Sequence, residues 1–330
     1  METIRFIDLF CGVGGFRVAM DAVCHENDII PSCVFSSDID PYCRESYKMN
    51  FGEEPFGDIT SVDVSEIPDH DVLFAGFPCQ PFSIIGKMQG FEDTRGTLFF
   101  YIAKILEAKR PTAFVLENVK QLVGHNGGRT LKVILRTLKE LGYHVHYSVL
   151  NALDYGLPQK RERVIIVGHR EPVLFSFPLP VRPFKPLSAI LEKHPDKKFY
   201  ASDYIRQKRK AAHTSAYKTA IWHENKSGNI CSYPYSCALR AGASYNYLLV
   251  NGERRLTPRE MFRLQGFPDS YKIIDNHSQA RKQAGNAVPV NMVKAVLGKL
   301  LPYVSETMDK TSVLHDYSVD YEPASSTYYE

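Results

Sequence analysis

The sequence lacks the usual features of secreted, zinc-binding and membrane-spanning proteins. Its seven cysteines are odd in number and include no CxxC pair, which argues against a disulfide framework and against a zinc site. The opening METIRFIDLF is too short and too acidic for a signal peptide, so we expect none, and no apolar run approaches membrane-spanning length. We therefore expect a cytoplasmic protein, in which a cysteine either fills the core or takes part in chemistry.

The sequence also has little excess of either positive or negative charge. The net charge of +3 excludes a strongly basic nucleic-acid-binding tail, although it leaves room for a local basic face. The sequence contains no internal repeat. With 330 residues, of which 44% are hydrophobic, the chain is long enough for one large core with a smaller module attached.

Short apolar runs alternate with helical patterns through the first half of the chain. Strands are predicted at residues 4–10, 33–36, 71–77, 112–116, 144–150 and 164–167, with a weak further segment around Phe56. Helices are predicted at residues 16–23 and 98–108. This alternation is typical of a doubly wound α/β fold with a mostly parallel sheet, to which we expect a small, irregular, β-containing domain to be attached.

The second half of the chain has a different texture. Residues 171–186 contain five prolines and predict a hinge, and residues 193–218 contain eight Lys or Arg against two Asp. The stretch LTPRE predicts a helix start with Thr257 as cap, and a further helix is expected after Pro289. The polar, tyrosine-rich tail after Met308 predicts loosely ordered chain.

Polar residues follow the predicted strands, at the edge where an open α/β sheet binds its ligands. Gly12, Gly14 and Gly15 follow the first strand and allow a tight turn close to a ligand. Arg17 stands where the GxGxxG fingerprint needs glycine, so a bound pyrophosphate is not required. An acid after the second strand and Asp58 could bind a ribose and an adenine. Alternatively, the glycines serve only a turn and the aspartates only cap helices.

A cysteine, a glutamate and two arginines form the sharper pattern. Cys79 follows a proline at the end of the strand predicted at 71–77, where a helix N-terminus or an arginine would favour its thiolate. Glu117 is the only acid in the apolar run PTAFVLENV, so burial should raise its pKa, which suits a proton donor. Arg161 and Arg163 point to one face of an extended strand. Together they suit attack on an electron-poor ring; the alternative is a core cysteine, a paired glutamate and surface charge.

These motifs resemble those of the bacterial restriction–modification (type II) DNA cytosine-5 methyltransferases. The matching segments, in the family's order, are FIDLFCGVGGF, GDIT, GFPCQPFS, DTRGTLFF, ENV, GLPQKRER, LTPRE, LQGFPDSY and QAGNAV. The resemblance implies the S-adenosylmethionine-dependent methyltransferase fold, with S-adenosylmethionine as cofactor and no metal. It also implies methylation of carbon 5 of a cytosine in a short specific double-stranded DNA sequence. A monomeric, nucleoid-associated bacterial protein with a restriction endonuclease as genetic companion would follow.

The resemblance assigns roles to the residues singled out above. Cys79 would add to carbon 6 of a flipped-out cytosine, Glu117 would protonate ring nitrogen 3, and Arg163, helped by Arg161, would orient the base. Cofactor contacts are expected from Phe10, Gly12, Gly14, Gly15, Asp38, Ile39, Asp58, Ile59, Phe77 and Asn286. The family usually has Glu where Asp38 stands, which makes Asp40 a second candidate for the ribose.

DNA-binding residues are expected in two places. Residues 80–96 resemble the family's mobile loop over the flipped base, with DNA contacts from Gln80, Ser83, Lys87, Gln89 and Arg95. Residues 1–180 and 272–330 would form the catalytic domain, and residues 181–271 the hinge and target-recognition domain. From the latter, contacts are expected from Arg209, Leu239 and Arg240, and phosphate contacts also from Lys197, Lys198, Arg206, Lys208 and Lys210. Ala238-Leu239 stands where the family carries Thr-Leu.

Three other functions stay open at this point. A tRNA cytosine-5 methyltransferase would use the same catalytic residues, but the compact basic insert and the lack of a CFT tripeptide favour DNA. A non-catalytic DNA-binding regulator is disfavoured because Cys79, Glu117 and Arg163 are all present. A nicotinamide oxidoreductase would require the complete glycine fingerprint.

Overall fold

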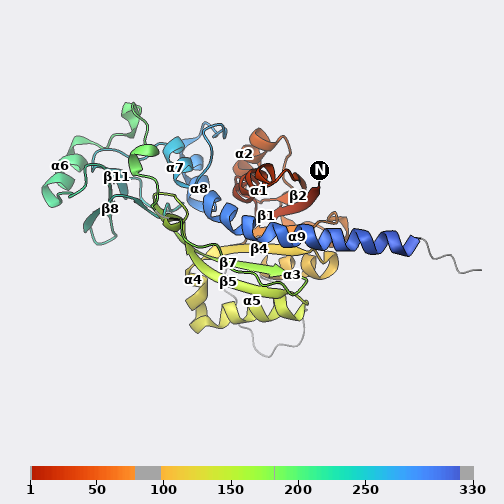
Figure 1. Cartoon of the computed structure of the whole chain (residues 1–330). Coiled ribbons are helices and arrows are strands. Elements are labelled where there is room, and N and C mark those ends of the chain that lie inside the picture. Colours follow the sequence, from red (N-terminus) through yellow and green to blue (C-terminus); the bar gives the residue numbers. More distant parts are fainter. Residues whose placement is uncertain (1, 79–97, 182, 320–330) are drawn as a thin grey trace, which may run out of the picture.

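The computed structural model describes residues 2–78, 98–181 and 183–319 of the chain. A six-stranded sheet with the order β2-β1-β3-β4-β7-β5 forms its centre (Figure 1). Its strands are β1 (Thr3–Leu9), β2 (Ile30–Ser37), β3 (Val72–Gly76), β4 (Ala113–Val119), β5 (His144–Asn151) and β7 (Glu162–His169). The predicted strands are confirmed, except that the weak segment around Phe56 makes an isolated bridge to Ser37 instead of a strand.

One strand of this sheet runs against the others. The pairs β1–β2, β1–β3 and β3–β4 are parallel, whereas β7 is antiparallel to both β4 and β5. Residues 152–161 join β5 to β7 without a crossover helix, so the chain returns in the opposite direction. The predicted mostly parallel α/β sheet is confirmed, with β7 as the exception to its parallel order.

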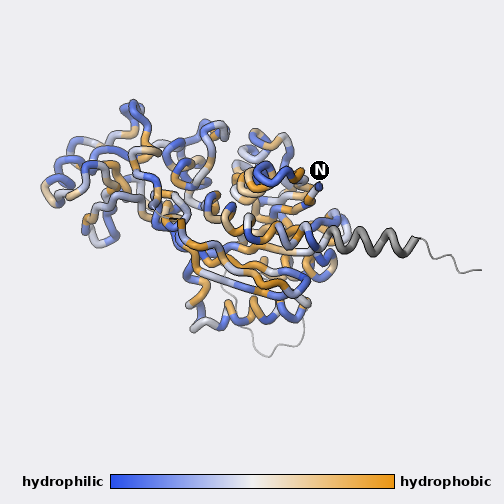
Figure 2. The backbone as a smooth tube through the Cα atoms, in the orientation of Figure 1, coloured by the Kyte–Doolittle hydropathy of each residue, from blue (hydrophilic) through white to orange (hydrophobic). Residues whose placement is uncertain are grey.

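Helices cover both faces of the sheet (Figure 1). They are α1 (Gly15–Glu26), α2 (Pro41–Phe51), α3 (Leu98–Lys109), α4 (Gln121–Gly124), α5 (Arg129–Glu140), α8 (His277–Asn286) and α9 (Val290–Val319). Successive strand residues point to opposite faces, so Phe6 of β1 joins the core under α1 and α9, and Ile7 joins the core under α3 and α5. Figure 2 shows hydrophobic residues concentrated along the strands between these layers.

A smaller unit lies at one end of the sheet, at the left of Figure 1. It contains α6 (Asp203–Ala212) and an antiparallel sheet of β8 (Ile221–Glu224), β9 (Ile230–Tyr233) and β11 (Leu248–Val250). The two-residue strand β10 (Ser236–Cys237) pairs in parallel with β6 (Gln159–Lys160), just before β7. Backbone pairing therefore attaches the small unit beside the start of β7.

Two predictions about the C-terminal part of the chain have different outcomes. Helix α7 (Pro258–Leu264) begins with the predicted capping box, in which Thr257 and Glu260 each accept from the other's backbone N–H. The predicted loosely ordered tail after Met308 is wrong up to residue 319, because α9 continues to Val319.

The segment His277–Thr307 also differs from the expectation for apolar runs. By length and composition it could cross a membrane, but 61% of its most apolar window is buried inside the protein. Helix α9 packs against α1 over the main sheet. Its hydrophobicity is therefore explained by the core that it helps to form.

Candidate active site

A cavity of about 700 Å³ lies at the carboxyl ends of β1, β2, β3 and β4 and the start of β7. The predicted site residues that line it are Phe10, Gly12, Gly15, Asp38, Ile39, Phe77, Glu117, Arg161, Arg163 and Asn286. Of the other predicted residues, Cys79, Gln80, Ser83, Lys87, Gln89 and Arg95 lie outside the described part of the chain. Most of the predicted site residues that the structure describes therefore lie together at this cavity.

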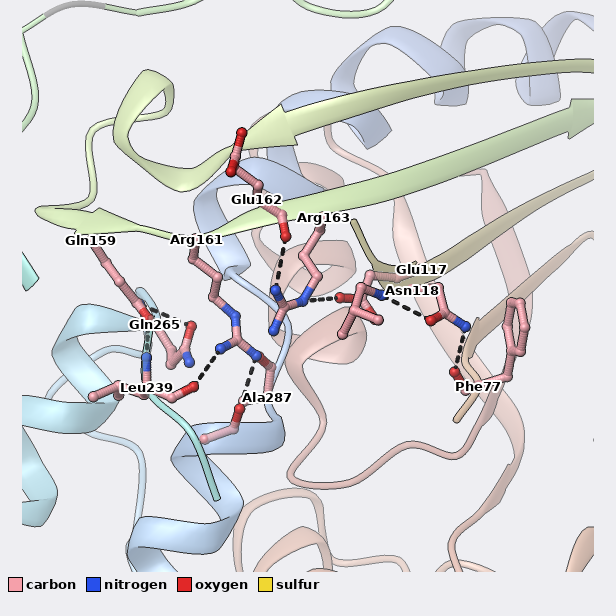
Figure 3. Close-up of polar contacts among 12 residues, drawn as sticks. Phe77, Glu117, Asn118, Gln159, Arg161, Glu162, Arg163, Leu239, Gln265 and Ala287 are labelled. Carbon is pink, nitrogen blue, oxygen red and sulfur yellow. Dashed lines mark hydrogen bonds and ion pairs between the residues drawn. The ribbon is translucent and has the colours of Figure 1, made fainter. Parts of the chain in front are cut away.

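Glu117 and Arg163 form an ion pair at this cavity (Figure 3). Glu117 pairs with Ile165 across the antiparallel strands, so Arg163 lies diagonally opposite on the same face. Its Nε is 2.8 Å from Glu117 Oε1. Burial raises the pKa of the Glu117 carboxyl, and the opposing effect of Arg163 and Arg161 does not cancel that rise. The pair combines a carboxyl of raised pKa with a fixed positive charge.

Asn118 is a site residue that the sequence analysis missed. Its Nδ2 donates to the carbonyl of Phe77 at 2.8 Å, and its Oδ1 accepts from the Val119 N–H at 2.8 Å. The side chain is buried, so it ties the end of β4 firmly to the chain that leaves β3. Its place beside the buried acid in ENV was the signal that could have identified it.

The turn after β1 explains two of the predicted glycines by packing. A Cβ atom on Gly14 would lie 2.3 Å from the Phe51 ring, and one on Gly15 would lie 2.6 Å from Val288. Gly12 has φ +54°, and a Cβ there would meet nothing within 4 Å. Gly14 does not line the cavity, so its structural role agrees with the alternative that it serves the turn. The positive φ of Gly12 favours glycine at this turn, and the residue lines the cavity.

Acidic residues after β2 organise the adjacent edge of the cavity. The Asp38 carboxylate accepts from the backbone N–H of Gly12 and of Asp40, each at 2.8 Å. Burial raises the pKa of Asp38, while these two hydrogen bonds oppose the rise. Asp40 caps α2 and lies 2.8 Å from Lys282 Nζ. Ile39, between the two acids, lines the cavity with 70% of its surface exposed.

Asp58 and Ile59 are placed differently from the other predicted cofactor residues. Neither lines the cavity. Asp58 is exposed, and its carboxylate accepts from the backbone N–H and the hydroxyl of Thr60, whereas Ile59 is buried in the core under α3 and α5. In this structure both have local structural roles.

Gln159 and Arg161 form a clamp on the backbone of Leu239 (Figure 3). Arg161 Nη1 donates to the Leu239 carbonyl at 3.0 Å, and Gln159 Oε1 accepts the Leu239 N–H at 3.0 Å. Arg161 Nη2 also donates to the carbonyls of Gly285 and Ala287, at 2.9 and 2.8 Å. Burial lowers the pKa of the Arg161 guanidinium to about 9.

This clamp changes the expected role of Arg161. The residue lines the cavity, as predicted, but its terminal nitrogens are hydrogen-bonded to backbone of the small unit and of the turn between α8 and α9. A guanidinium has five N–H donors, and three of them are used in this way. Arg161 therefore holds the small unit against the edge of the main sheet, and its expected help in orienting the base stays a prediction.

We expect Arg161→Met to loosen the small unit. The change leaves three buried carbonyls without their donor, which should lower the free energy of unfolding by about 2–4 kcal/mol. Trp222, the only tryptophan, is buried in β8 and reports on the small unit, whereas far-ultraviolet circular dichroism reports on the whole chain. In urea, the fluorescence transition should precede the dichroism transition.

Arg170→Met is the matched control for that variant. Arg170 also donates to one backbone carbonyl, that of Arg110, but in an exposed position where water can replace it. Its removal should change the free energy of unfolding by no more than about 0.5 kcal/mol. Equal stability of the two variants, with coincident transitions in both, would contradict the assigned role of the clamp.

Three of the basic residues that are expected to meet phosphates, Arg206, Arg209 and Lys210, form ion pairs with acids of the small unit. Arg209 is 2% exposed, and its Nη2 lies 2.6 Å from Glu224 Oε2. Arg206 and Lys210 both pair with Glu253. These pairs already neutralise much of the positive run, and Arg209 cannot reach DNA without breaking its own. Its burial and its pairing with Glu224 are those of a residue that holds the small unit together.

The sequence model of the family described as C-5 cytosine-specific DNA methylase matches residues 4–301. The chain belongs to this family. It is 57% identical over 294 residues to the type II methyltransferase M.NgoBI of Neisseria gonorrhoeae, covering 88% of this chain and 91% of that protein. It is 52% identical over 304 residues to M.HaeII of Haemophilus aegyptius, covering 91% and 94%. The resemblance inferred from the motifs is confirmed, and the protein is a cytosine-5 DNA methyltransferase.

Solved structures of lower identity share the fold of this cytosine-5 methyltransferase. The methyltransferase EhMeth of Entamoeba histolytica aligns with a TM-score of 0.71 at 17% identity, covering 93% of this chain and 99% of that one. The Dnmt2 methyltransferase of S. pombe aligns with a TM-score of 0.70 at 20% identity, covering 91% and 98%. These likenesses confirm the fold class.

Proposed function

We propose that this methyltransferase modifies carbon 5 of one cytosine in a short, specific double-stranded DNA sequence. The observation that carries the proposal is the buried Glu117–Arg163 pair on a cavity at the strand ends, in a chain of this family. Because its relatives M.NgoBI and M.HaeII are named type II methyltransferases, we assign it to a restriction–modification system, where it protects host DNA. It acts as a monomer near the nucleoid, with a restriction endonuclease as genetic companion, and residues 181–271 form its hinge and target-recognition domain.

In the proposed reaction the cytosine is flipped out of the duplex, and Cys79 donates a thiolate electron pair to its carbon 6. Glu117 gives a proton to nitrogen 3, so the ring becomes a neutral enamine with a nucleophilic carbon 5. Arg163 orients the base through its carbonyl oxygen. Transfer of the methyl group to carbon 5 would leave S-adenosylhomocysteine, and nitrogen 3 returns its proton to Glu117. A base then removes the carbon 5 proton, and the 5,6 double bond re-forms as the bond from carbon 6 to sulfur breaks and Cys79 leaves as thiolate.

The cavity suits S-adenosylmethionine, which when bound supplies an electrophilic methyl group on a sulfonium. Exposed Ile39 offers an apolar surface for a flat adenine, and the neighbouring Asp38 and Asp40 offer carboxylates for a ribose. The ligand carries no phosphate, which agrees with the incomplete glycine fingerprint. We propose that the remaining contacts come from Phe10, Gly12, Gly15, Phe77 and Asn286, all on the cavity wall.

A direct assay tests this function. The purified protein, with radiolabelled S-adenosylmethionine, is offered duplex DNA and, separately, total tRNA, and the DNA is then sequenced after bisulfite treatment. We expect methyl incorporation into duplex DNA, at one cytosine within one short recurring sequence. Incorporation into tRNA alone, or into neither substrate, would refute the proposal.

A further inference from the structure

Two arginines of the small unit and one of α8 meet where the small unit touches α8. The guanidinium carbon of Arg240 lies 4.9 Å from the Tyr247 ring centre, and those of Arg255 and Arg281 lie 5.4 and 4.5 Å from the Tyr245 ring centre. All five residues line one small crevice, together with His277. We call Arg240, Arg255 and Arg281 the arginine cluster.

No acid of the described chain neutralises the arginine cluster. Among the described residues, none of its members lies within 4.0 Å of a carboxylate, whereas Arg206 and Arg209 of the same unit are both paired. The Nε atoms of Arg255 and Arg281 are buried and have no hydrogen-bond partner in the described chain. The terminal nitrogens of Arg255 and Arg281 donate only to backbone carbonyls of the described chain, those of Lys198 and Ser244, so the positive charge of the cluster is available to an anionic partner.

His277 shows the same excess of positive charge. Burial lowers the pKa of its imidazole, and the neighbouring Arg255, Arg281 and Lys198 lower it further. Its Nε2 is also buried without a partner among the described residues. The crevice is therefore cationic, and the guanidiniums of Arg255 and Arg281 both lie against the Tyr245 ring.

We propose that the arginine cluster binds the phosphodiester backbone of the DNA duplex, a role that rests on the proposed function. Arginine matches phosphate geometry through paired N–H donors, and its stacking on tyrosine reduces the flexibility that binding would have to remove. The cluster takes the place of the basic run at 193–218, which the sequence favoured and whose Arg206, Arg209 and Lys210 are already paired.

The position of the cluster links DNA binding to the catalytic edge. Arg240 follows Leu239, whose backbone is held by the clamp of Gln159 and Arg161. Helix α8 contributes Arg281 to the cluster and Lys282, one residue further, to the catalytic cavity. A phosphate bound by the cluster is therefore held at a fixed distance from Glu117 and Arg163, which places the duplex for base flipping.

Two triple variants that lose the same charge test the proposal. One carries Arg240→Gln, Arg255→Gln and Arg281→Gln; the control carries Lys132→Gln, Lys139→Gln and Lys299→Gln, at exposed positions of α5 and α9. Binding is measured from 50 to 300 mM salt on a duplex with the methylated sequence and on one without it. Each lost phosphate contact reduces the slope of log K against log salt by about 0.9. For the arginine variant we expect the magnitude of this slope to decrease by about 2–3, equally on both duplexes. For the control we expect a decrease of less than about 1.

The possible outcomes are distinct. Equal slopes for the two triple variants, or a loss confined to the duplex with the methylated sequence, would overturn the phosphate site, the latter indicating base reading instead. Arg281→Lys, which keeps the charge, should keep the slope and separates charge loss from misfolding. If the wild type failed to methylate DNA, the proposed function would fail, yet the slopes would still show whether the cluster binds phosphate.

Discussion

Replacing Glu117 with glutamine is expected to slow methyl transfer by about 10²–10⁴-fold in a single turnover, the range typical of a lost general acid. The amide can still fill the space beside Arg163, but it has no proton to release to nitrogen 3. In the wild type the raised pKa keeps Glu117 protonated to higher pH than usual. The rate should therefore fall as pH rises through that pKa, and this fall should disappear in Glu117→Gln.

Glu162→Gln is the matched control for that experiment. The side chain of Glu162 points away from the cavity and pairs with Lys120 at 2.8 Å, and Arg163 uses its backbone carbonyl only (Figure 3). This variant should keep the wild-type rate and pH profile. A Glu117→Gln protein that retains both, within a factor of about five, would rule out proton donation by Glu117.

The second large effect is expected for Cys79→Ala. Without the thiolate there is no addition to carbon 6, and turnover should fall by about 10⁴-fold or more, as for other lost nucleophiles. Duplex DNA containing 5-fluorocytosine gives a sharper measurement. Fluorine at carbon 5 prevents loss of a proton there, so the wild-type adduct persists through a denaturing gel, and Cys79→Ala should form none.

Cys231→Ala controls for nonspecific thiol chemistry. Cys231 is exposed in the small unit, away from the residues that line the cavity. The Cys231→Ala protein should form the covalent adduct with the fluorinated duplex to the same extent as the wild type. A Cys79→Ala protein that forms as much adduct as the Cys231→Ala protein would show that another residue is the nucleophile.

The parts of the molecule that could be predicted depend on local sequence. Buried strands appear as continuous apolar runs, so β3 and β4 were identified to within a few residues. Glu117 was identified because it is the single acid in such a run. The carboxyl ends of parallel strands meet at one edge of a sheet. This rule alone predicted that Phe10, Asp38 and Phe77 would lie close together, and all three line the cavity.

The parts that could not be predicted depend on partners far away in the sequence. Arg161 donates to the carbonyls of Leu239 and Gly285, which are 78 and 124 residues away in the sequence. A hydrogen bond to backbone leaves no hydrophobic pattern in the sequence that could predict it. The basic run at residues 193–218 predicts a DNA-binding surface. Only the structure shows that Glu224 and Glu253 form ion pairs with its Arg209 and Lys210. The reversed direction of β7 is equally hidden, because hydrophobic alternation is the same for either strand direction.

The clamp also explains how the unusual Ala238-Leu239 pair can be accommodated. Gln159 and Arg161 touch only the amide and carbonyl of residue 239, atoms that every amino acid except proline provides. These hydrogen bonds therefore do not depend on the side chain at position 239, although the Leu239 side chain itself is buried in the core. We expect the residues beside the clamp to tolerate substitution without loss of the hydrogen bonds that hold the small unit to the main sheet.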